Sequence, residues 1–273
     1  MRRGLAPSRE QAQTLIARGA VLVAGAPAGK PSRLVAPGEP IVVLGPGPRF
    51  VGRGGEKLDA ALARFCIEVR GRRALDAGAS TGGFTDCLLQ RGAAGVVAVD
   101  VGHGQLHETV RADPRVMALE RTDIRSLSLT AIGQEPFELI VADLSFISLR
   151  TVAPALVGRL AAPDADIVVL IKPQFEAGRR VAARARGVVR DPAVWAEVLE
   201  TVGSALARHG AAMMEVMVSP LTGADGNVEF LAHLRAHVRP DSPVDRKAVD
   251  TAAVVAEALA VHGDPAGGSG TTR

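Results

Sequence analysis

The chain has 273 residues, of which 47% are hydrophobic and 22% charged, a composition typical of globular proteins and not of disordered or fibrous ones. Its two cysteines, Cys66 and Cys87, are too few for a disulfide framework or a four-ligand zinc site, and the 3% of aromatic residues disfavours a broad base-stacking platform. The net charge is +3, but residues 1–57 carry nine basic and three acidic residues, whereas residues 58–273 carry 23 and 26.

The first 47 residues predict a small α+β module. Ser8–Arg18 has a helical pattern in which Ser8 is the expected N-cap and Gly19 the stop. Short strands are expected at Val21–Val23 and Ile41–Leu44, before the turn residues Pro46-Gly47-Pro48. Because about 47 residues form only a marginal core alone, we expect this module to be attached to a larger domain.

Residues 57–240 alternate between short apolar runs and helical patterns. Helices are expected at Phe84–Arg91, Leu149–Leu160 and Pro192–Arg208. Strands are expected at Ala74–Ala77, Val96–Asp100, Val116–Leu119, Leu139–Asp143, Ile167–Ile171, Met213–Val218 and Val228–Leu234. This alternation predicts a Rossmann-like α/β domain whose seven-stranded, mostly parallel sheet is covered on both faces.

The remaining segments complete the expected organisation. Residues 48–56 are interpreted as a linker, and residues 241–273 as a helix over Val244–Val261 followed by a disordered Gly/Ser/Thr tail. The densest aliphatic stretch, Ile167–Ile171, is five residues long, whereas a membrane-spanning helix needs about 20. No signal-peptide core follows Met1, so we expect a cytoplasmic protein without a membrane partner.

The segment Ala74-Leu-Asp-Ala-Gly-Ala-Ser-Thr-Gly-Gly-Phe-Thr85 reads as a strand, a glycine-rich turn and a helix start, which in a doubly wound sheet lies beside the ligand crevice. The spacing Gly78-x-x-x-Gly82-Gly83 is neither the G-x-G-x-x-G of dinucleotide sites nor a P-loop. Asp100 closes the second strand and could bind ribose hydroxyls, and Asp123 follows the third strand and could accept a hydrogen bond from an adenine amino group. A plain helix-capping turn with solvent-facing acids is the alternative.

Three acids after successive strands, together with this loop, resemble the S-adenosylmethionine site of class I methyltransferases. The resemblance implies that this cofactor is bound by a set of loop and strand-end residues. They are Asp76, Gly78, Ala79, Ser80, Thr81, Gly82, Gly83, Phe84, Asp100, Asp123 and Asp143.

Four polar residues, Lys57, Asp143, Lys172 and Glu229, follow the order of the catalytic tetrad of FtsJ/RrmJ-type ribose 2′-O-methyltransferases. The fourth strand lacks the Asn/Asp-Pro-Pro-aromatic turn of enzymes that methylate base amino groups. The chain is similar over about residues 1–237 to the TlyA family, called "hemolysin A" but known as ribosomal RNA cytidine 2′-O-methyltransferases. The motifs that carry this resemblance are Arg-Gly-Gly-x-Lys-Leu, Leu-Asp-x-Gly-Ala-Ser-Thr-Gly-Gly-Phe-Thr, Asp-Leu-Ser-Phe-Ile-Ser, Lys-Pro-Gln-Phe-Glu and Gly-Asn-x-Glu-Phe.

The resemblance implies a division of labour in this tetrad. A ribose 2′-hydroxyl is a poor nucleophile until its proton leaves, and an amine can take that proton only in its neutral form, which a nearby cation and partial desolvation favour. We expect Lys172 to be the base, Asp143 and Glu229 to orient it, and Lys57 to favour its neutral form and position the hydroxyl. In-line alignment is then the protein's main task, and no metal is required.

The first zone resembles an S4 RNA-binding module through Ser8-Arg9-x-x-Ala12-x-x-Leu15-Ile16, Gly19-x-Val21-x-Val23-x-Gly25 and Lys30-Pro31. A first helix normally precedes Arg3-Gly-Leu-Ala6, so either the module lacks it or the true start lies upstream. A second basic cluster, which ends at Arg190, follows the fifth strand. With this cluster, the expected RNA-binding residues are Arg3, Ser8, Arg9, Arg18, Lys30, Arg53, Arg179, Arg180, Arg184 and Arg186.

The expected partner is ribosomal RNA or a ribosomal subunit, bound by a monomer. Two alternatives stay open: an RNA-binding assembly factor whose methyltransferase domain is inactive, and a membrane-active hemolysin. Only four lysines occur among 32 basic residues, and two of them, Lys57 and Lys172, fall in the tetrad. Arginine stays protonated and could not replace a lysine that accepts a proton.

Overall fold

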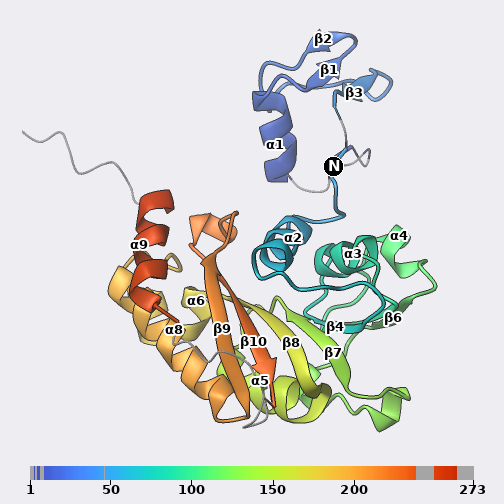
Figure 1. The fold of residues 1–273 in the computed structure, drawn as a ribbon. Coiled ribbons are helices and arrows are strands. Elements are labelled where there is room, and N and C mark those ends of the chain that lie inside the picture. The colour runs from blue at the N-terminus through green and yellow to red at the C-terminus, as the bar shows by residue number, and fades with distance from the viewer. Residues whose placement is uncertain (1–2, 4, 7–8, 46, 238–248, 263–273) are drawn as a thin grey trace, which may run out of the picture. The chain divides into compact units, whose positions relative to one another are not determined.

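The computed structural model describes residues 3, 5–6, 9–45, 47–237 and 249–262 (Figure 1). The chain divides into two compact units, Met1–Gly52 and Arg53–Arg273. The division falls inside the segment 48–56 that the sequence suggests as a linker.

The smaller unit contains α1 (Arg9–Ala17) and an antiparallel sheet of order β2-β1-β3, formed by β1 (Val21–Val23), β2 (Ala26–Pro27) and β3 (Ile41–Val43). The turn between β1 and β2 has two central residues with positive φ, Ala24 at 50° and Gly25 at 81°, as in the tight turns that match strand twist. The two-residue strand β2 is too short to leave a sequence pattern and was not expected. Ser8, the expected cap, lies outside the described residues.

The larger unit is built on a seven-stranded sheet of order β6-β5-β4-β7-β8-β10-β9. β10 runs antiparallel to both β8 and β9, and the other pairings are parallel, so the expected mostly parallel sheet is confirmed. The strands are β4 (Arg73–Ala77), β5 (Gly95–Val99), β6 (Val116–Leu119), β7 (Phe137–Ala142), β8 (Ala161–Ile171), β9 (Ala211–Val218) and β10 (Phe230–Ala236).

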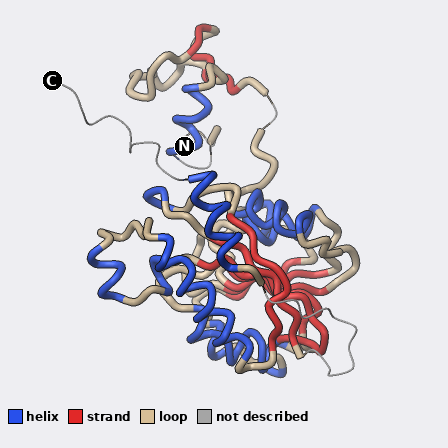
Figure 2. Tube along the Cα trace, turned by 60° about the vertical axis from the view of Figure 1, so that its left-hand side comes forward, coloured by secondary structure: helices blue, strands red, loops and turns tan. Residues whose placement is uncertain are grey.

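Helices lie on both sides of this strand layer (Figure 2). The α-helices are α2 (Gly54–Arg64), α3 (Gly83–Gln90), α4 (Glu108–Arg111), α5 (Leu149–Ala155), α6 (Pro173–Glu176), α7 (Arg179–Arg184), α8 (Pro192–Ala207) and α9 (Thr251–His262). Short 3₁₀ turns span Ile124–Ser126, Thr130–Ile132 and Ala224–Gly226, and a π-helical turn spans Leu156–Leu160. No described helix is both long enough and apolar enough to cross a bilayer.

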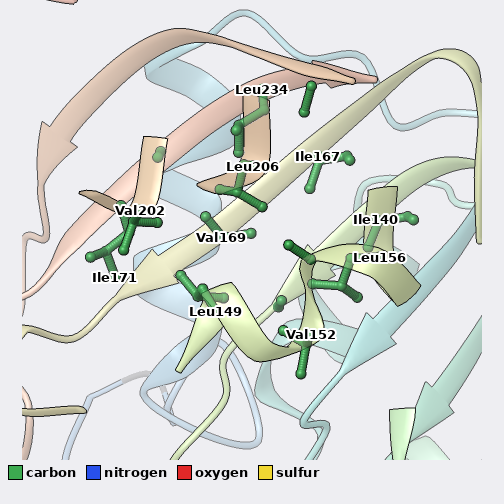
Figure 3. Close-up of a cluster of buried hydrophobic side chains, with 14 of the residues drawn as sticks. Ile140, Leu149, Val152, Leu156, Ile167, Val169, Ile171, Val202, Leu206 and Leu234 are labelled. Atoms are coloured by element: carbon green, nitrogen blue, oxygen red, sulfur yellow. The ribbon is translucent and has the colours of Figure 1, made fainter. Parts of the chain in front are cut away.

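The hydrophobic core fixes β7 and β8 at the centre of the sheet. On one face Ile140, Val169 and Ile171 pack with side chains of α5 and α8, among them Leu149 and Leu206 (Figure 3). Successive strand residues point to opposite faces, so the residue that follows Ile171 faces the other side, where α2 and α3 lie. The central strands are buried on both faces, which makes their carboxyl ends a rigid base for functional side chains.

One helix that the sequence analysis does not predict and one shifted helix start are the main differences among the helices. α2 begins at Gly54, so the last three residues of the expected linker are helical; the Arg-Gly-Gly start had concealed this helix. The C-terminal helix begins at Thr251, because Asp250 accepts a hydrogen bond from the backbone N–H of Ala253 and caps it. Val249 and Asp250 are not helical. Residues 244–248 of the predicted helix, and the tail expected to be disordered, lie outside the described residues.

Candidate active site

The carboxyl ends of the central strands meet at one edge of the sheet, where the glycine-rich loop Gly78–Gly83 leaves β4. The backbone N–H groups of Gly78 and Ala79 donate to the carbonyl of Val99 at 2.8 and 3.1 Å, and the N–H of Asp143 donates to the carbonyl of Ala77 at 3.0 Å. These bonds tie the loop to the ends of β5 and β7. A cavity of about 530 Å³ opens above them, lined by Gly78, Ser80, Val99, Asp100, Val101, Gln105, Thr122, Asp123, Ile124, Arg125, Asp143, Leu144, Ser145, Phe146 and Ile147.

Two glycines are required here by packing within the protein. A Cβ on Gly78, whose φ is +86°, would lie 2.5 Å from the carbonyl oxygen of Asp143. A Cβ on Gly82, whose φ is +94°, would lie 2.8 Å from the side chain of Leu106. Both glycines therefore let the loop approach its own neighbours in a backbone conformation that other residues rarely adopt.

Asp76 is the most deeply buried of the predicted cofactor-site acids, with no exposed surface. One oxygen, Oδ2, accepts a hydrogen bond from the Thr85 hydroxyl at 2.6 Å, while Oδ1 has no hydrogen-bond partner. Burial raises the pKa of this carboxyl to about 7, although the Thr85 hydrogen bond acts in the opposite direction. Asp76 lines neither of the two cavities described here, so it supports the loop from below through Thr85 and is not placed to contact a ligand.

Asp100 and Asp123 also line the larger cavity, and both already have partners. Asp100 accepts from the backbone N–H groups of Ser80 and Gly102 at 2.8 and 2.7 Å, so the carboxylate is held at the end of β5. Asp123 is bound by the guanidinium of Arg125, which lowers the pKa of its carboxyl. Each carboxylate oxygen can accept more than one hydrogen bond, so these contacts leave room for ligand hydroxyl and amino groups.

The four residues of the predicted tetrad line a second cavity of about 230 Å³, which shares Gly78, Ser80 and Asp143 with the larger one. They form two ion pairs. Lys172 Nζ lies 2.6 Å from Asp143 Oδ1 and donates to Ser145 Oγ at 2.9 Å. Lys57 Nζ lies 2.5 Å from Glu229 Oε2. The side-chain exposures of 9% for Lys57 and 3% for Glu229 make the second pair a buried one.

The strand register explains why residues so distant in the chain meet. β10 pairs with β8 so that Phe230 lies opposite Ile171, which places Glu229 across from Lys172 on the face toward α2. Lys57 comes from α2 itself. The structure differs from the sequence expectation in one respect: the carboxylate of Glu229 pairs with Lys57, and only Asp143 pairs with Lys172.

Sequence reasoning missed three parts of the site. Gly223 lines the smaller cavity, and a Cβ there would lie 2.1 Å from Glu229 Oε1. The side chain of Phe146 is 91% exposed and its backbone has φ +64°, a conformation costly for an aromatic residue. Its ring centroid lies 5.0 Å from that of Phe175. The Asp-Leu-Ser-Phe motif contained Phe146, but nothing in the sequence indicated its exposure.

The expected RNA-binding residues fall into several environments. The guanidinium of Arg3 donates to the backbone carbonyls of Ala36, Pro37 and Glu39, so it supports its own unit. Arg53 lines the smaller cavity. Ser8 and the side chains of Arg9 and Arg179 lie outside what the structure describes. The exposed members are Arg18, Lys30, Arg180, Arg184 and Arg186.

Comparison with known proteins agrees with this architecture. A family model described as "FtsJ-like methyltransferase" matches residues 50–236, and one described as "S4 domain" matches residues 2–41. The "16S/23S rRNA (cytidine-2'-O)-methyltransferase TlyA" of Mycobacterium tuberculosis (strain ATCC 25618 / H37Rv) is 52% identical over 236 residues, which cover 86% of this chain and 87% of that protein. "Hemolysin A" of Brachyspira hyodysenteriae is 38% identical over 84% of this chain and 95% of its own length.

A solved structure from Streptococcus thermophilus, whose name also refers to hemolysin, is similar over 95% of this chain and 93% of its own. Its TM-score is 0.77 at 38% sequence identity. The sheet order, the loop after β4 and the matching family models define a Rossmann-like methyltransferase preceded by an S4 domain. The chain belongs to the FtsJ-like methyltransferase family and, within it, to the group of the TlyA enzymes, as the sequence motifs predicted.

Proposed function

We propose that this protein transfers a methyl group from S-adenosylmethionine to the 2′-hydroxyl of a cytidine ribose in ribosomal RNA. The observation that carries the proposal is the placement of two lysine–carboxylate pairs in a cavity that joins the larger cavity beside Asp100. Among the described residues, no group of three or more His, Cys, Asp or Glu side chains is arranged to hold a metal ion.

The larger cavity fits the proposed cofactor in chemistry. Asp100 would accept hydrogen bonds from the ribose hydroxyls, and Asp123 from the exocyclic amine of the adenine. Val101, which is 71% exposed, and Ile124 offer aliphatic surface for the adenine ring. The carboxylate of Asp143, which lines both cavities, would complement the positive charge of the sulfonium. When bound, the cofactor supplies a methyl group already activated by its sulfonium sulfur.

The smaller cavity would hold the ribose that is methylated. Lys172, in its neutral form, would accept the proton of the 2′-hydroxyl, whose oxygen would take the methyl group that the bound cofactor supplies. Asp143 and Ser145 fix the direction of the Lys172 amine. The Lys57–Glu229 pair lines the same cavity and would place the Lys57 ammonium near the reacting oxygen. Proton removal by a positioned base contributes typically 10²–10⁴-fold to a rate.

An exposed aromatic side chain at the larger cavity, close in sequence to Asp143, offers a place for a nucleobase. Phe146 lines the larger cavity, packs against Phe175, and is almost fully exposed. A nucleotide must leave its stack before its ribose can enter such a site, and base–aromatic stacking is worth about 1–3 kcal/mol. We infer that Phe146 holds the base of the target nucleotide or of its neighbour.

The S4 domain and the arginines of α7 would bind RNA phosphates. Arg180 and Arg184 are exposed, and α7 begins seven residues after Lys172. Reversing both charges should lower RNA affinity and reduce its salt dependence, while calorimetric binding of the cofactor stays unchanged. An equal loss of both kinds of binding would indicate misfolding and refute this role of α7.

The test of the proposed activity is transfer of labelled methyl groups from S-adenosylmethionine to isolated ribosomal subunits. We expect transfer by the wild-type protein and its loss in Lys172→Arg, which keeps the charge but cannot accept a proton. Binding of the cofactor by Lys172→Arg serves as the control for folding. Wild-type protein that binds subunits without transferring methyl groups would favour the assembly-factor alternative.

A further inference from the structure

Glu176 is a buried carboxyl that lies outside both cavities, at the end of the short helix α6. Only 5% of the residue is exposed. Its Oε2 accepts a hydrogen bond from the Ser148 hydroxyl at 2.5 Å, and its Oε1 accepts one from the backbone N–H of Leu149 at 2.6 Å. Burial raises the pKa of this carboxyl, although both hydrogen bonds act in the opposite direction. Both oxygens are therefore bound to the segment that begins α5.

Arg150 adds a second connection between the same two segments. Its Nη2 donates to the backbone carbonyl of Glu176 at 2.8 Å, and its Nε lies 3.7 Å from Glu176 Oε2. The same Nε donates to Ser148 Oγ at 3.1 Å. The polar partners of the Glu176 side chain therefore lie in the segment Ser148–Arg150.

These contacts connect the two loops that carry the proposed base and its partner. Ser148 follows Asp143 by five residues, and Glu176 follows Lys172 by four. Between the same loops, Lys172 bonds to Asp143 and Ser145, and Phe175 packs against Phe146. The contacts between the two loops therefore begin with the Lys172–Asp143 ion pair, continue with the Phe175–Phe146 contact and end with Glu176 and Ser148.

We propose that Glu176 is a positioning residue that holds the loop after β7 against the loop after β8, and so keeps Lys172 and Phe146 aligned with the reacting ribose. The inference rests on the proposed function. The stem of a lysine is flexible and Phe146 occupies a strained backbone conformation, so neither is fixed by its own chain geometry. A displacement of about 1 Å at a reacting centre can lower a rate by about 10²-fold.

The test compares Glu176→Ala and Glu176→Gln with the wild-type protein in methyl transfer to ribosomal subunits. For Glu176→Ala we expect kcat to fall about 10- to 100-fold, and the KM and the calorimetric Kd for the cofactor to change much less, because the loop after β7 forms only one side of the larger cavity. Glutamine keeps one acceptor oxygen but turns an NH₂ group toward the Ser148 hydroxyl or the Leu149 N–H. The kcat of Glu176→Gln should therefore lie between those of Glu176→Ala and the wild-type protein. The matched control is Glu197→Ala. Glu197 belongs to α8, is exposed and lies near Glu176, and its replacement should leave kcat at the wild-type value.

A readout independent of turnover is amide hydrogen exchange. Glu176→Ala should speed exchange in residues 143–149 and leave residues 95–100 unchanged. If Glu176→Ala does not fold, Glu176→Gln is used for both measurements. Unchanged kcat in the folded variant, or equal losses of kcat and cofactor affinity, would overturn the role of Glu176 alone. Wild-type protein that transfers no methyl group would instead overturn the proposed function and, with it, this role.

Discussion

Replacing Asp76 by asparagine should make the protein more stable at alkaline pH relative to wild type. The carboxyl is fully buried, and burial raises its pKa to about 7 from the ordinary value of 3.8. Between these two values the folded protein keeps a proton that the unfolded chain has released. Folding therefore loses stability as the pH rises through this range.

The size of this effect follows from the same two numbers. Each pKa unit corresponds to about 1.4 kcal/mol. The difference between pKa values of 3.8 and about 7 therefore limits the loss in the wild-type free energy of unfolding to roughly 4 kcal/mol by pH 8. Asparagine has no such titration, and its amide oxygen can still accept from Thr85. Its NH₂ group would lack a partner where Oδ1 now lies, which costs about 1–3 kcal/mol at every pH. The difference in the free energy of unfolding between the two proteins should thus change with pH, even though the unpartnered NH₂ group of asparagine costs the same at every pH.

The assay is urea unfolding of both proteins without cofactor at pH 5, 6.5 and 8. We expect the free energy of unfolding of Asp76→Asn minus that of wild type to increase steadily across this series. Thr85→Val removes the hydrogen bond that favours the ionised carboxyl, so it should extend the pH-dependent loss to higher pH. A difference that stays constant with pH would refute the reasoning, because it would show that Asp76 is ionised to the same extent in both states.

Three further predictions concern other parts of the larger unit. Asp166 is buried and binds Arg72, His233 and Arg235, which together lower the pKa of its carboxyl against the effect of burial. Asp166→Asn should lower the free energy of unfolding in urea by about 3–5 kcal/mol at pH 7, and this loss should shrink as the pH falls below 3.8. The control Asp164→Asn, at an exposed residue, should cost under about 0.5 kcal/mol. Gly223→Ala should displace the Glu229 side chain and lower kcat at least about 10-fold in steady-state kinetics. An unchanged kcat would contradict the close approach of Gly223 to Glu229 Oε1. Phe146→Ala should raise the KM for RNA by about 10-fold, and an unchanged KM would argue against base stacking there.

The centre of the sheet was predictable because its strands are buried on both faces. The second half of β8 is an uninterrupted apolar run, as is most of β7, and the end of β7 at Asp143 and of β8 at Lys172 could be located to within a residue. The order of the acids and lysines then placed them at one edge, since the carboxyl ends of parallel strands meet there.

The partners within the site were less predictable because they depend on contacts between distant elements. Glu229 pairs with Lys57 because β10 returns antiparallel beside β8 and faces α2. The contacts of Glu176 with Ser148 and Leu149 likewise join segments that are far apart in sequence. Gly223 is only six residues from Glu229, but its close approach depends on the turn between them. Helix boundaries differed where a local cap decided them, as at Asp250.

The most direct test of the central claim is the chemical position of the transferred methyl group. Ribosomal subunits methylated by the wild-type protein are digested to nucleosides and separated by mass spectrometry. The Lys57–Glu229 and Lys172–Asp143 pairs predict a methyl group on a ribose oxygen, and the similarity to the TlyA enzymes predicts that the nucleoside is cytidine. The product should be absent when Lys172→Arg is used. A methyl group on a base, or the same ribose product from Lys172→Arg, would contradict the account.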